Sequence, residues 1–413
     1  MTAVAVNGAA QLLRPPDEGL EYLRHDRAGD QRTGPGSMLI DGELIAGFED
    51  SGDADTRIDA SGCAVIPGFV DCHTHLPFAG WREREYELKI AGESYETIAR
   101  AGGGIRSSAR SLADASDGDV LAQAQGLAGE MLAHGTTTFE CKSGYGLSVE
   151  GERRSVALAA ELSGRVVQST RSTALLAHAV PDGYERDTWM DVVEQMLPEV
   201  LAAGDVSALD IYVESVAFSN DDLSRMGDLA RRHELDLRAH VEQFNANGSV
   251  PVALEAGARS VDHLACLTDD ELAQLAGAET AAVLLPGAEM LGDERLAPAR
   301  ALADAGAICV LGTDLNPGTS PILSIPLVIG LAVRRYRWST LEALLACTLN
   351  AAWVLRMSDR VGSLEAGKRA DVVVLDGPLE RIAYQFGRNP VAAVIAGGDV
   401  VHVRGDCGWR ISE

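Results

Sequence analysis

Two histidines separated by one residue are the first candidates for chemistry in this sequence. His73 and His75 directly follow a short apolar run, residues 65–71. Residues i and i+2 of a strand point to the same side, so the two imidazoles would face one space and could hold a metal ion. Paired histidines are also common on exposed strands. An isolated pair is therefore a weak signal.

The ends of later apolar runs supply further candidates. Three of them end in a histidine or an aspartate: His240 after 236–239, His263 after 260–261 and Asp314 after 308–312. Three imidazoles and one carboxylate suit a divalent ion such as Zn²⁺ or Fe²⁺ and leave a position for water, whose activation hydrolysis requires. The remaining histidine and the aspartate would then transfer protons. Core histidines bonded to backbone carbonyls are the alternative, and this alternative explains any single residue better than the whole set.

These positions need an architecture that gathers the ends of many strands. Short β-like runs alternate with stretches of helical period such as 121–134 and 187–203, the pattern of repeated βα units. The runs are 65–71, 136–141, 166–177, 208–214, 236–239, 260–261, 281–285 and 308–312. Eight units suit a (β/α)₈ barrel, whose chemistry lies at the C-terminal ends of its strands. An open doubly wound sheet would predict a phosphate-binding glycine fingerprint, and Gly-Gly-Gly-Ile at 102–105 is not one.

Both ends of the chain have a different texture. Residues 38–47 place Asp-Gly between apolar pairs, a strong hairpin signal, and residues 370–375 and 392–403 are apolar strands with turn glycines. We therefore predict an α/β protein with two parts. A TIM-like (β/α)₈ barrel spans residues 65–357, and residues 1–64 and 358–413 build a composite β-sandwich domain.

Composition and charge exclude several classes of protein. The chain has 413 residues, of which 46% are hydrophobic and 23% charged, as in folded soluble proteins. Its 35 basic and 61 acidic residues give a net charge of −26, which would repel nucleic acids and anionic membranes. The longest apolar region, 321–333, is shorter than the ~18 residues that span a bilayer. Seven cysteines without a CxxC pair indicate reduced thiols, so we expect a cytoplasmic protein with no nucleic-acid or membrane partner.

Longer motifs resemble a known superfamily. Pro67-Gly-Phe-Val-Asp-Cys-His-Thr-His75 and Gly362-Ser-Leu-Glu-Ala-Gly-Lys-Arg-Ala-Asp371 are similar to segments of the metal-dependent amidohydrolases. Within that superfamily the chain resembles the imidazolonepropionases, which open 4-imidazolone-5-propanoate to N-formimino-L-glutamate in histidine degradation. This narrower resemblance rests on segments 78–85, 101–105, 142–147, 177–181 and 313–320. It implies a barrel with a β-sandwich made from both termini, hydrolysis of a cyclic amide, and a homodimer.

The resemblance also implies roles for single residues. It makes His73, His75, His240 and Asp314 the ligands of one divalent metal ion, Zn²⁺ or Fe²⁺, and it makes His263 the proton-transfer histidine. Around a small anionic substrate it places Arg82, Tyr95, Tyr145, His178, Gln243, Asn316, Gly318 and Thr319. A guanidinium can hold a propanoate group through two parallel charge-assisted hydrogen bonds, although Arg82 could instead form a surface ion pair.

Two positions need separate interpretations. Some members of the family carry a glutamate where this chain has Gln243, and a glutamine can bond the substrate ring but cannot shuttle a proton. Acid–base work is therefore assigned to His263 and Asp314. Lys142 lies at the end of the second predicted strand, where a carbamylated lysine could bridge two metals. We favour an orienting or structural role for this lysine.

Two other functions stand as alternatives. An aminohydrolase of the same superfamily would release ammonia from a nucleobase-like heterocycle, and Gln243 and the propanoate-suited Arg82 argue against it. A non-catalytic scaffold relative should have lost its metal ligands. This chain keeps every expected ligand, so we predict an enzyme.

Overall fold

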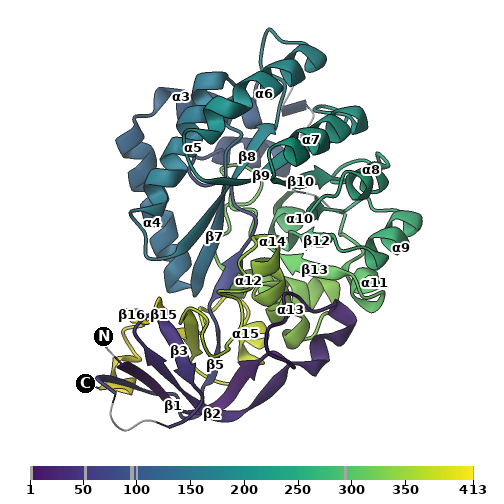
Figure 1. The fold of residues 1–413 in the computed structure, drawn as a ribbon. Coiled ribbons are helices and arrows are strands. Elements are labelled where there is room, and N and C mark those ends of the chain that lie inside the picture. Colours follow the sequence, from purple (N-terminus) through teal and green to yellow (C-terminus); the bar gives the residue numbers. More distant parts are fainter. Residues whose placement is uncertain (1–2, 51–53, 94–96, 99–100, 293–294, 413) are drawn as a thin grey trace.

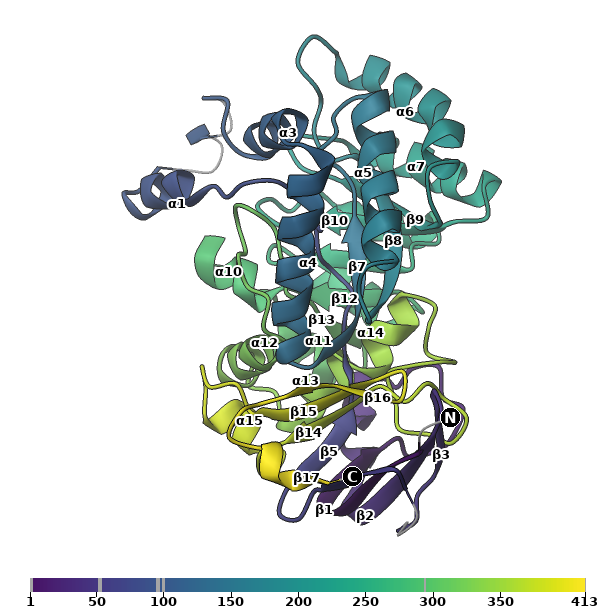
Figure 2. The ribbon, with the colours of Figure 1, turned by 90° about the vertical axis from the view of Figure 1, so that its left-hand side faces the viewer.

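The strands of the protein form two separate sheets. The computed structural model describes residues 3–412 apart from 51–53, 94–96, 99–100 and 293–294. An eight-stranded barrel sheet lies above a nine-stranded terminal sheet, and both chain ends lie beside the terminal sheet (Figures 1 and 2). The predicted α/β class and TIM-like barrel are confirmed. No helix of the described residues is long and apolar enough to cross a membrane.

Eight parallel strands form the barrel in the order of the sequence. They are β6 (Phe69–Asp71), β7 (Thr136–Lys142), β8 (Ser169–Ala177), β9 (Val206–Tyr212), β10 (Asp236–Val241), β11 (Ser260–His263), β12 (Ala281–Leu284) and β13 (Ile308–Leu311). Backbone hydrogen bonds just beyond β6 and β13 join the last strand to the first. The N–H of Asp314 donates to the carbonyl of His73 at 2.9 Å, and the N–H of His75 donates to that of Leu315 at 2.9 Å.

The run 65–71, which we expected to be one strand, is divided between the two sheets. β5 (Ala64–Pro67) pairs with β1 and β14 of the terminal sheet, whereas β6 pairs with β7 of the barrel. Gly68 connects them, and a Cβ on this residue would lie 2.1 Å from Oγ1 of Thr137. Both halves are buried, so the apolar run is continuous and its periodicity cannot reveal the change of sheet.

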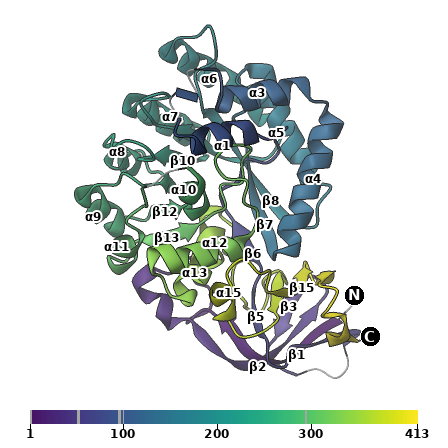
Figure 3. The same cartoon turned by 180° about the vertical axis from the view of Figure 1, so that it is seen from behind.

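Apart from the first, which projects away from the barrel and has no buried residue, the helices surround the barrel on its outer side (Figures 1, 2 and 3). They are α1 (Glu83–Ile90), α3 (Ile105–Asp114), α4 (Asp117–Ala133), α5 (Val149–Ser163), α6 (Arg186–Leu201), α7 (Asn220–Arg232), α8 (Ser249–Glu255), α9 (Asp269–Gly277), α10 (Pro286–Gly292), α11 (Ala299–Asp304), α12 (Ile325–Leu331), η2 (Ala332–Tyr336), α13 (Thr340–Ala346) and α14 (Leu349–Val354). Hydroxyl side chains cap several N-termini; Ser219 and Thr268, for example, form reciprocal capping boxes that satisfy the first N–H groups of α7 and α9.

The terminal sheet combines strands from both ends of the chain. They are β1 (Ala3–Arg14), β2 (Arg32–Asp41), β3 (Leu44–Gly47), β4 (Thr56–Asp59), β5, β14 (Val372–Leu375), β15 (Val391–Ala396), β16 (Asp399–Val403) and β17 (Ile411–Ser412), with α15 (Arg381–Tyr384) and η3 (Gly408–Arg410) between the later ones. The predicted hairpin at 38–47 is present, and Gly42 and Glu43 form its turn. One hydrophobic core includes Val4 and Ile40 from the first part and Val372 and Ile395 from the last.

The segment η1 (His25–Asp30) packs against the barrel rather than against the terminal sheet. The backbone N–H of His25 donates to the carbonyl of Ala307 at 3.1 Å, and its ring centre lies 4.2 Å from that of Trp338. The side chain is 1% exposed, and neither ring nitrogen has a hydrogen-bond partner in the described part of the chain. Burial lowers the pKa of His25 to about 3, although Glu342 opposes the shift. The ring is therefore neutral in the folded protein at neutral pH.

We predict that His25 makes folding sensitive to acid. Because its pKa falls from 6.5 to about 3 on folding, the unfolded chain binds the extra proton, and stability is lost as the pH falls from 6.5 toward 3. The loss approaches about 1.4 kcal/mol per pH unit, or about 2 kcal/mol at pH 5. His25→Leu should remove this part of the pH dependence of the unfolding free energy, measured by urea denaturation at pH 7 and pH 5. His233→Leu, at an exposed position, is the control and should keep the wild-type slope. Equal slopes in His25→Leu and wild type would refute the prediction.

Candidate functional site

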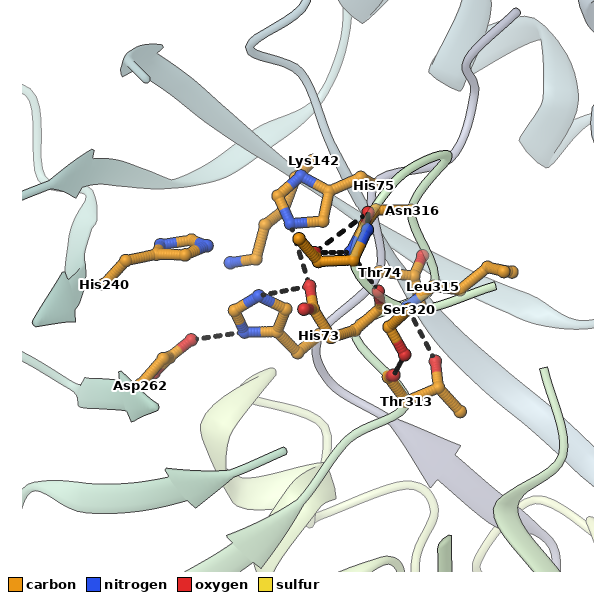
Figure 4. A network of polar contacts seen from close by, with 12 residues as sticks. His73, Thr74, His75, Lys142, His240, Asp262, Thr313, Leu315, Asn316 and Ser320 are labelled. Carbon is orange, nitrogen blue, oxygen red and sulfur yellow. Dashed lines mark hydrogen bonds and ion pairs between the residues drawn. The ribbon is translucent and has the colours of Figure 1, made fainter. Parts of the chain in front are cut away.

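The C-terminal ends of the barrel strands bring the predicted metal ligands together. Figure 4 shows His73, His75 and His240 around one space. Oδ1 of Asp314 lies 3.4 Å from Nε2 of His73 and 3.3 Å from Nε2 of His75. Two donors that are each about 2.1 Å from a tetrahedral ion lie about 3.4 Å apart, so these separations fit a bound divalent ion. Ligand atoms of His73, His240 and His263 also lie within 4.8 Å of one another.

Carboxylates behind two of the histidines leave the metal-facing nitrogens available. Nδ1 of His73 lies 2.6 Å from Oδ2 of Asp262, and Nδ1 of His240 lies 3.0 Å from Oδ1 of Asp210. Nε2 of both histidines is buried without a hydrogen-bond partner among the described residues. A carboxylate at Nδ1 keeps the proton there and leaves a lone pair on Nε2, as in carboxylate–histidine–metal arrangements. The donor set therefore fits a divalent metal ion.

Left-handed backbone conformations help to orient the side chains of Asp314 and His263. Asp314 has a φ of 54°, and His263 and Leu264 have φ values of 82° and 66°. Left-handed backbone is costly for residues other than glycine, by about 1–2 kcal/mol each. It interrupts the regular alternation at the end of β11, so that Asp262 contacts His73 inside the barrel while the next residue, His263, lines the pocket.

A pocket opens at the candidate metal cluster, and the space free of atoms there, open solvent included, is about 410 Å³. The predicted site residues that line it are His75, Arg82, Tyr145, His178, His240, Gln243, His263, Asp314, Asn316 and Thr319. His73 is fully buried and contacts Asp314 without lining the pocket itself. Gly318 lines a neighbouring groove that shares Arg82 with the pocket. Tyr95 lies outside the described residues.

Three histidines of the pocket, His75, His178 and His263, are neutral at neutral pH. Burial lowers the pKa of His75 to about 4 and that of His263 to about 3, and it holds the pKa of His178 well below its usual range. Burial alone would raise the pKa of Asp314, but the adjacent His73 and His75 hold it well below its usual value. Neutral imidazoles and an ionised carboxylate are the forms that bind metals and accept protons.

Arg82 is the cation of the pocket wall. Its backbone N–H donates to the carbonyl of Pro317 at 2.8 Å, and its side chain is 7% exposed. Nε and Nη1 have no hydrogen-bond partner in the part of the chain that the structure describes, and Glu85 is 3.7 Å from Nε. The guanidinium rests on Gly318, where a Cβ would lie 1.4 Å from Nη2. The protein thus holds buried guanidinium donors that suit a carboxylate ligand.

Asn316 and Thr319 use their polar atoms within their own loop. Oδ1 of Asn316 accepts hydrogen bonds from the N–H groups of Gly318 at 2.8 Å and Thr319 at 2.7 Å. Its Nδ2 donates to the carbonyl of Asp314 at 2.7 Å and to Oγ1 of Thr319 at 2.9 Å. The resemblance implied that both residues surround the substrate, and both do line the pocket. Their bonds also fix the loop that carries Asp314 and supports Arg82.

Backbone contacts fix the ring of His178. Its Nδ1 lies 3.0 Å from the carbonyl oxygen of Gly144, and its ring stacks on that of His75 with centres 5.4 Å apart. A Cβ on Gly144 would lie 2.8 Å from the same Nδ1, and the residue has a φ of 111°. Glycine at this position therefore permits the close approach of the two segments.

The structure also places the two residues that needed separate interpretations. Gln243 lines the pocket, whereas the neighbouring Glu242 accepts hydrogen bonds from the N–H groups of Asn247 and Ser249, each at 2.7 Å. Nζ of Lys142 lies 2.6 Å from Asp210. Burial and Arg238 oppose the charge on Lys142, but Asp210 and Glu140 raise its pKa, so the amine is an ammonium group. An ammonium group suits an orienting role and not a carbamate bridge.

Three pocket residues escaped the sequence interpretation. Tyr212, Phe244 and Ile105 also line the pocket. Tyr212 is the last residue of β9, but the predicted run 208–214 continued two residues beyond it, so the strand-end rule did not point to this tyrosine. Phe244 and Ile105 are apolar residues outside the strands and carry no comparable signal.

Comparisons with known proteins identify the family of the chain. A family model described as the amidohydrolase family matches residues 64–401. The chain belongs to the amidohydrolase family. Within it, this amidohydrolase is 43% identical to the imidazolonepropionase of Herpetosiphon aurantiacus over 84% of each chain. It is also 40% identical to the imidazolonepropionase of Deinococcus radiodurans over 92% of this chain and 98% of that one.

These identities over most of the chain place the amidohydrolase in the imidazolonepropionase family. A solved structure, the guanine deaminase of E. coli, shares its fold with a TM-score of 0.67 over 98% of this chain and 100% of that chain, at 16% identity. The amidohydrolase family is metal-dependent, and the histidine and aspartate groups described above are the candidate metal-binding groups of this member.

Proposed function

We propose that the protein hydrolyses the cyclic amide bond of 4-imidazolone-5-propanoate and yields N-formimino-L-glutamate, a step of histidine degradation. The observation that carries the proposal is the presence of two unlike features in one pocket. The His75, His240 and Asp314 cluster suits a metal that assists hydrolysis, and Arg82 offers buried guanidinium donors to a carboxylate. The close relatives named imidazolonepropionase support the same substrate.

The pocket offers a complementary group for each part of this substrate. The propanoate pairs with Arg82, and Tyr145, His178 and Gln243 line the space for a flat ring with alternating donors and acceptors. The chain carries a net charge of −26, so its overall field opposes an anionic substrate. Arg82 and the metal therefore provide the local positive charge. The resemblance also implies that Tyr95 contacts the substrate, and that role stays a prediction.

In this proposal one Zn²⁺ or Fe²⁺ ion would be held by His73, His75, His240 and Asp314, the ligands that the resemblance implies; all four belong to two overlapping groups of possible metal ligands. Such an ion supplies a water of lowered pKa and polarises the carbonyl that is attacked. His263 and Asp314 would accept a proton from the attacking water, whose oxygen bonds to the carbonyl carbon, and would return that proton to the ring nitrogen as the carbon–nitrogen bond breaks. Gln243 donates or accepts a hydrogen bond but moves no proton. A homodimer in the cytoplasm stays a prediction.

We predict that the purified protein contains about one divalent ion per chain and consumes imidazolonepropionate without releasing ammonia. The measurements are elemental analysis, the loss of ring absorbance and an ammonia assay. His240→Ala removes one ligand and should abolish both metal retention and turnover. His134→Ala changes a histidine at the end of α4, outside the pocket, and should change neither. Ammonia release from another heterocycle would favour the aminohydrolase instead, and a metal-free, inactive wild type would favour the scaffold.

We also predict that the contact between Gly318 and Arg82 controls substrate binding. Gly318→Ala places a methyl group where the guanidinium lies, so it should displace Arg82 and raise KM by about 10- to 100-fold, as expected for loss of a charge-assisted carboxylate contact. Arg82→Met should raise KM at least as much. Metal content should not change in either variant. Gly129→Ala is the control, because nothing lies within 4 Å of its added Cβ. Wild-type KM in both variants would exclude Arg82 as the carboxylate site.

A further inference from the structure

Five charged side chains fill the barrel beneath the candidate metal cluster. They are Glu140, Lys142, Asp210, Arg238 and Asp262, each exposed by 1% or less. They come from β7, β9, β10 and β11 and point into the barrel together with the ligand histidines; Arg238, for example, precedes His240 by two residues. The proposed reaction does not use these groups directly.

One half of this group leads to His73. Nδ1 of His73 lies 2.6 Å from Oδ2 of Asp262, and the same oxygen lies 3.0 Å from Nη2 of Arg238 (Figure 4 shows the first of these contacts). Nη1 of Arg238 pairs with Oε1 of Glu140. Other donors of the guanidinium are also used: Nε donates to Oγ of Ser260 at 2.9 Å, and Nη1 donates to the carbonyl of Cys72 at 2.8 Å. Arg238 is therefore held in one orientation.

The other half leads from the same glutamate to His240. Oε2 of Glu140 lies 3.0 Å from Nζ of Lys142, and that nitrogen lies 2.6 Å from Oδ2 of Asp210. Oδ1 of Asp210 then lies 3.0 Å from Nδ1 of His240. In Figure 4, Lys142 reaches toward His73 and His240. Two ligand histidines are thus connected by a continuous chain of buried ion pairs, which we call the interior charge chain: Asp262, Arg238, Glu140, Lys142 and Asp210.

Stability alone does not explain the interior charge chain. Removing charges from water is expensive, and buried ion pairs can often be replaced by apolar side chains without loss of stability. The outer faces of the same strands contribute to a large apolar core, which includes Leu209, Leu237 and Val261. The arrangement of the chain has a clear chemical consequence, because it ends on the ring nitrogens opposite the two metal-facing Nε2 atoms.

We propose that Arg238, Glu140 and Lys142 are positioning residues that fix both ligand histidines together. Arg238 and Lys142, which both pair with Glu140, orient Asp262 and Asp210, and these carboxylates face Nδ1 of His73 and His240, which keeps the proton on Nδ1 and a lone pair on Nε2. Glu140 forms ion pairs with both Lys142 and Arg238. A substitution of Glu140, in the middle of the interior charge chain, should therefore affect both histidines. The inference rests on the metal site of the proposed function but does not depend on which substrate is hydrolysed.

The test measures Zn²⁺ affinity by competition with a chromogenic chelator, together with the unfolding free energy of the metal-free protein. Asp262→Asn keeps the side-chain size but lets an amide N–H face Nδ1, which moves the imidazole proton to Nε2. We expect it to weaken Zn²⁺ binding by about 10- to 100-fold. Glu140→Gln should weaken binding by about tenfold without touching a ligand. Arg238→Lys should retain a higher Zn²⁺ affinity than Arg238→Met. Lysine keeps the positive charge, although it lacks the planar set of guanidinium donors, whereas methionine has neither.

A matched control separates positioning from general loss of a buried ion pair. Lys368 is also buried and forms an ion pair with Glu365 at 2.8 Å. Both residues precede β14 of the terminal sheet in the sequence. Lys368→Met should lower stability and leave Zn²⁺ affinity unchanged. The double variant Asp210→Asn/Asp262→Asn provides a second readout: if the chain couples the histidines, its fold-change in affinity should differ from the product of the single changes by more than about threefold.

The outcomes distinguish this inference from the proposed function. If Asp262→Asn and Glu140→Gln lose stability but bind Zn²⁺ within threefold of wild type, the positioning role is wrong, even if the enzyme hydrolyses imidazolonepropionate. If the affinities fall as expected while the wild type acts on a different ring, the positioning role is supported and the proposed substrate is wrong. A wild type without a Zn²⁺ site would overturn both.

Discussion

The backbone hydrogen bond from Asp314 to His73 is the interaction on which both the fold and the site depend. It joins the segment after β13 to the segment after β6 and so closes the ring of strands. The same two residues carry donor atoms 3.4 Å apart in the candidate metal cluster. A parallel barrel has one end at which all strands finish, and the ligands are assembled there when the first and last strands meet. Barrel closure and assembly of the site are therefore one structural event.

The two faces of the barrel strands contact different kinds of side chains. The outward faces of its strands and the inner faces of its helices form an apolar core that supplies most of the stabilising burial. The lumen instead contains ionised side chains that are almost completely buried, such as Arg238 and Asp262. Because an unpaired buried charge is strongly destabilising, each of these groups restricts its neighbours to the few arrangements that satisfy all of them. That restriction suits histidines whose nitrogens must stay in a fixed place.

Sequence reasoning pointed to the residues of the candidate metal cluster because strand ends are visible as the boundaries of apolar runs. His240, His263 and Asp314 each stand at such a boundary, and the barrel fold brings these boundaries together. The division of 65–71 between two sheets could not be predicted, because burial on both sides removes any change of periodicity. The partners of Arg238 were also hidden. Ion pairs between β7, β10 and β11 depend on the register of the strands, which a single sequence does not specify.

The acidic surface of the chain is compatible with the proposed anionic substrate. The surface charges act on the substrate at long range, whereas Arg82 would act on it in direct contact. At physiological ionic strength, the field of exposed charges falls off over about 8 Å, so a net charge of −26 acts on the approach of a ligand more than on its bound state. Arg82 is largely withdrawn from solvent, so it would act on the proposed carboxylate by direct contact, where screening is weak. The surface charge should therefore lower the association rate and respond to salt. In the proposed function, affinity in the pocket would depend instead on the guanidinium and on a metal ion bound by the histidines.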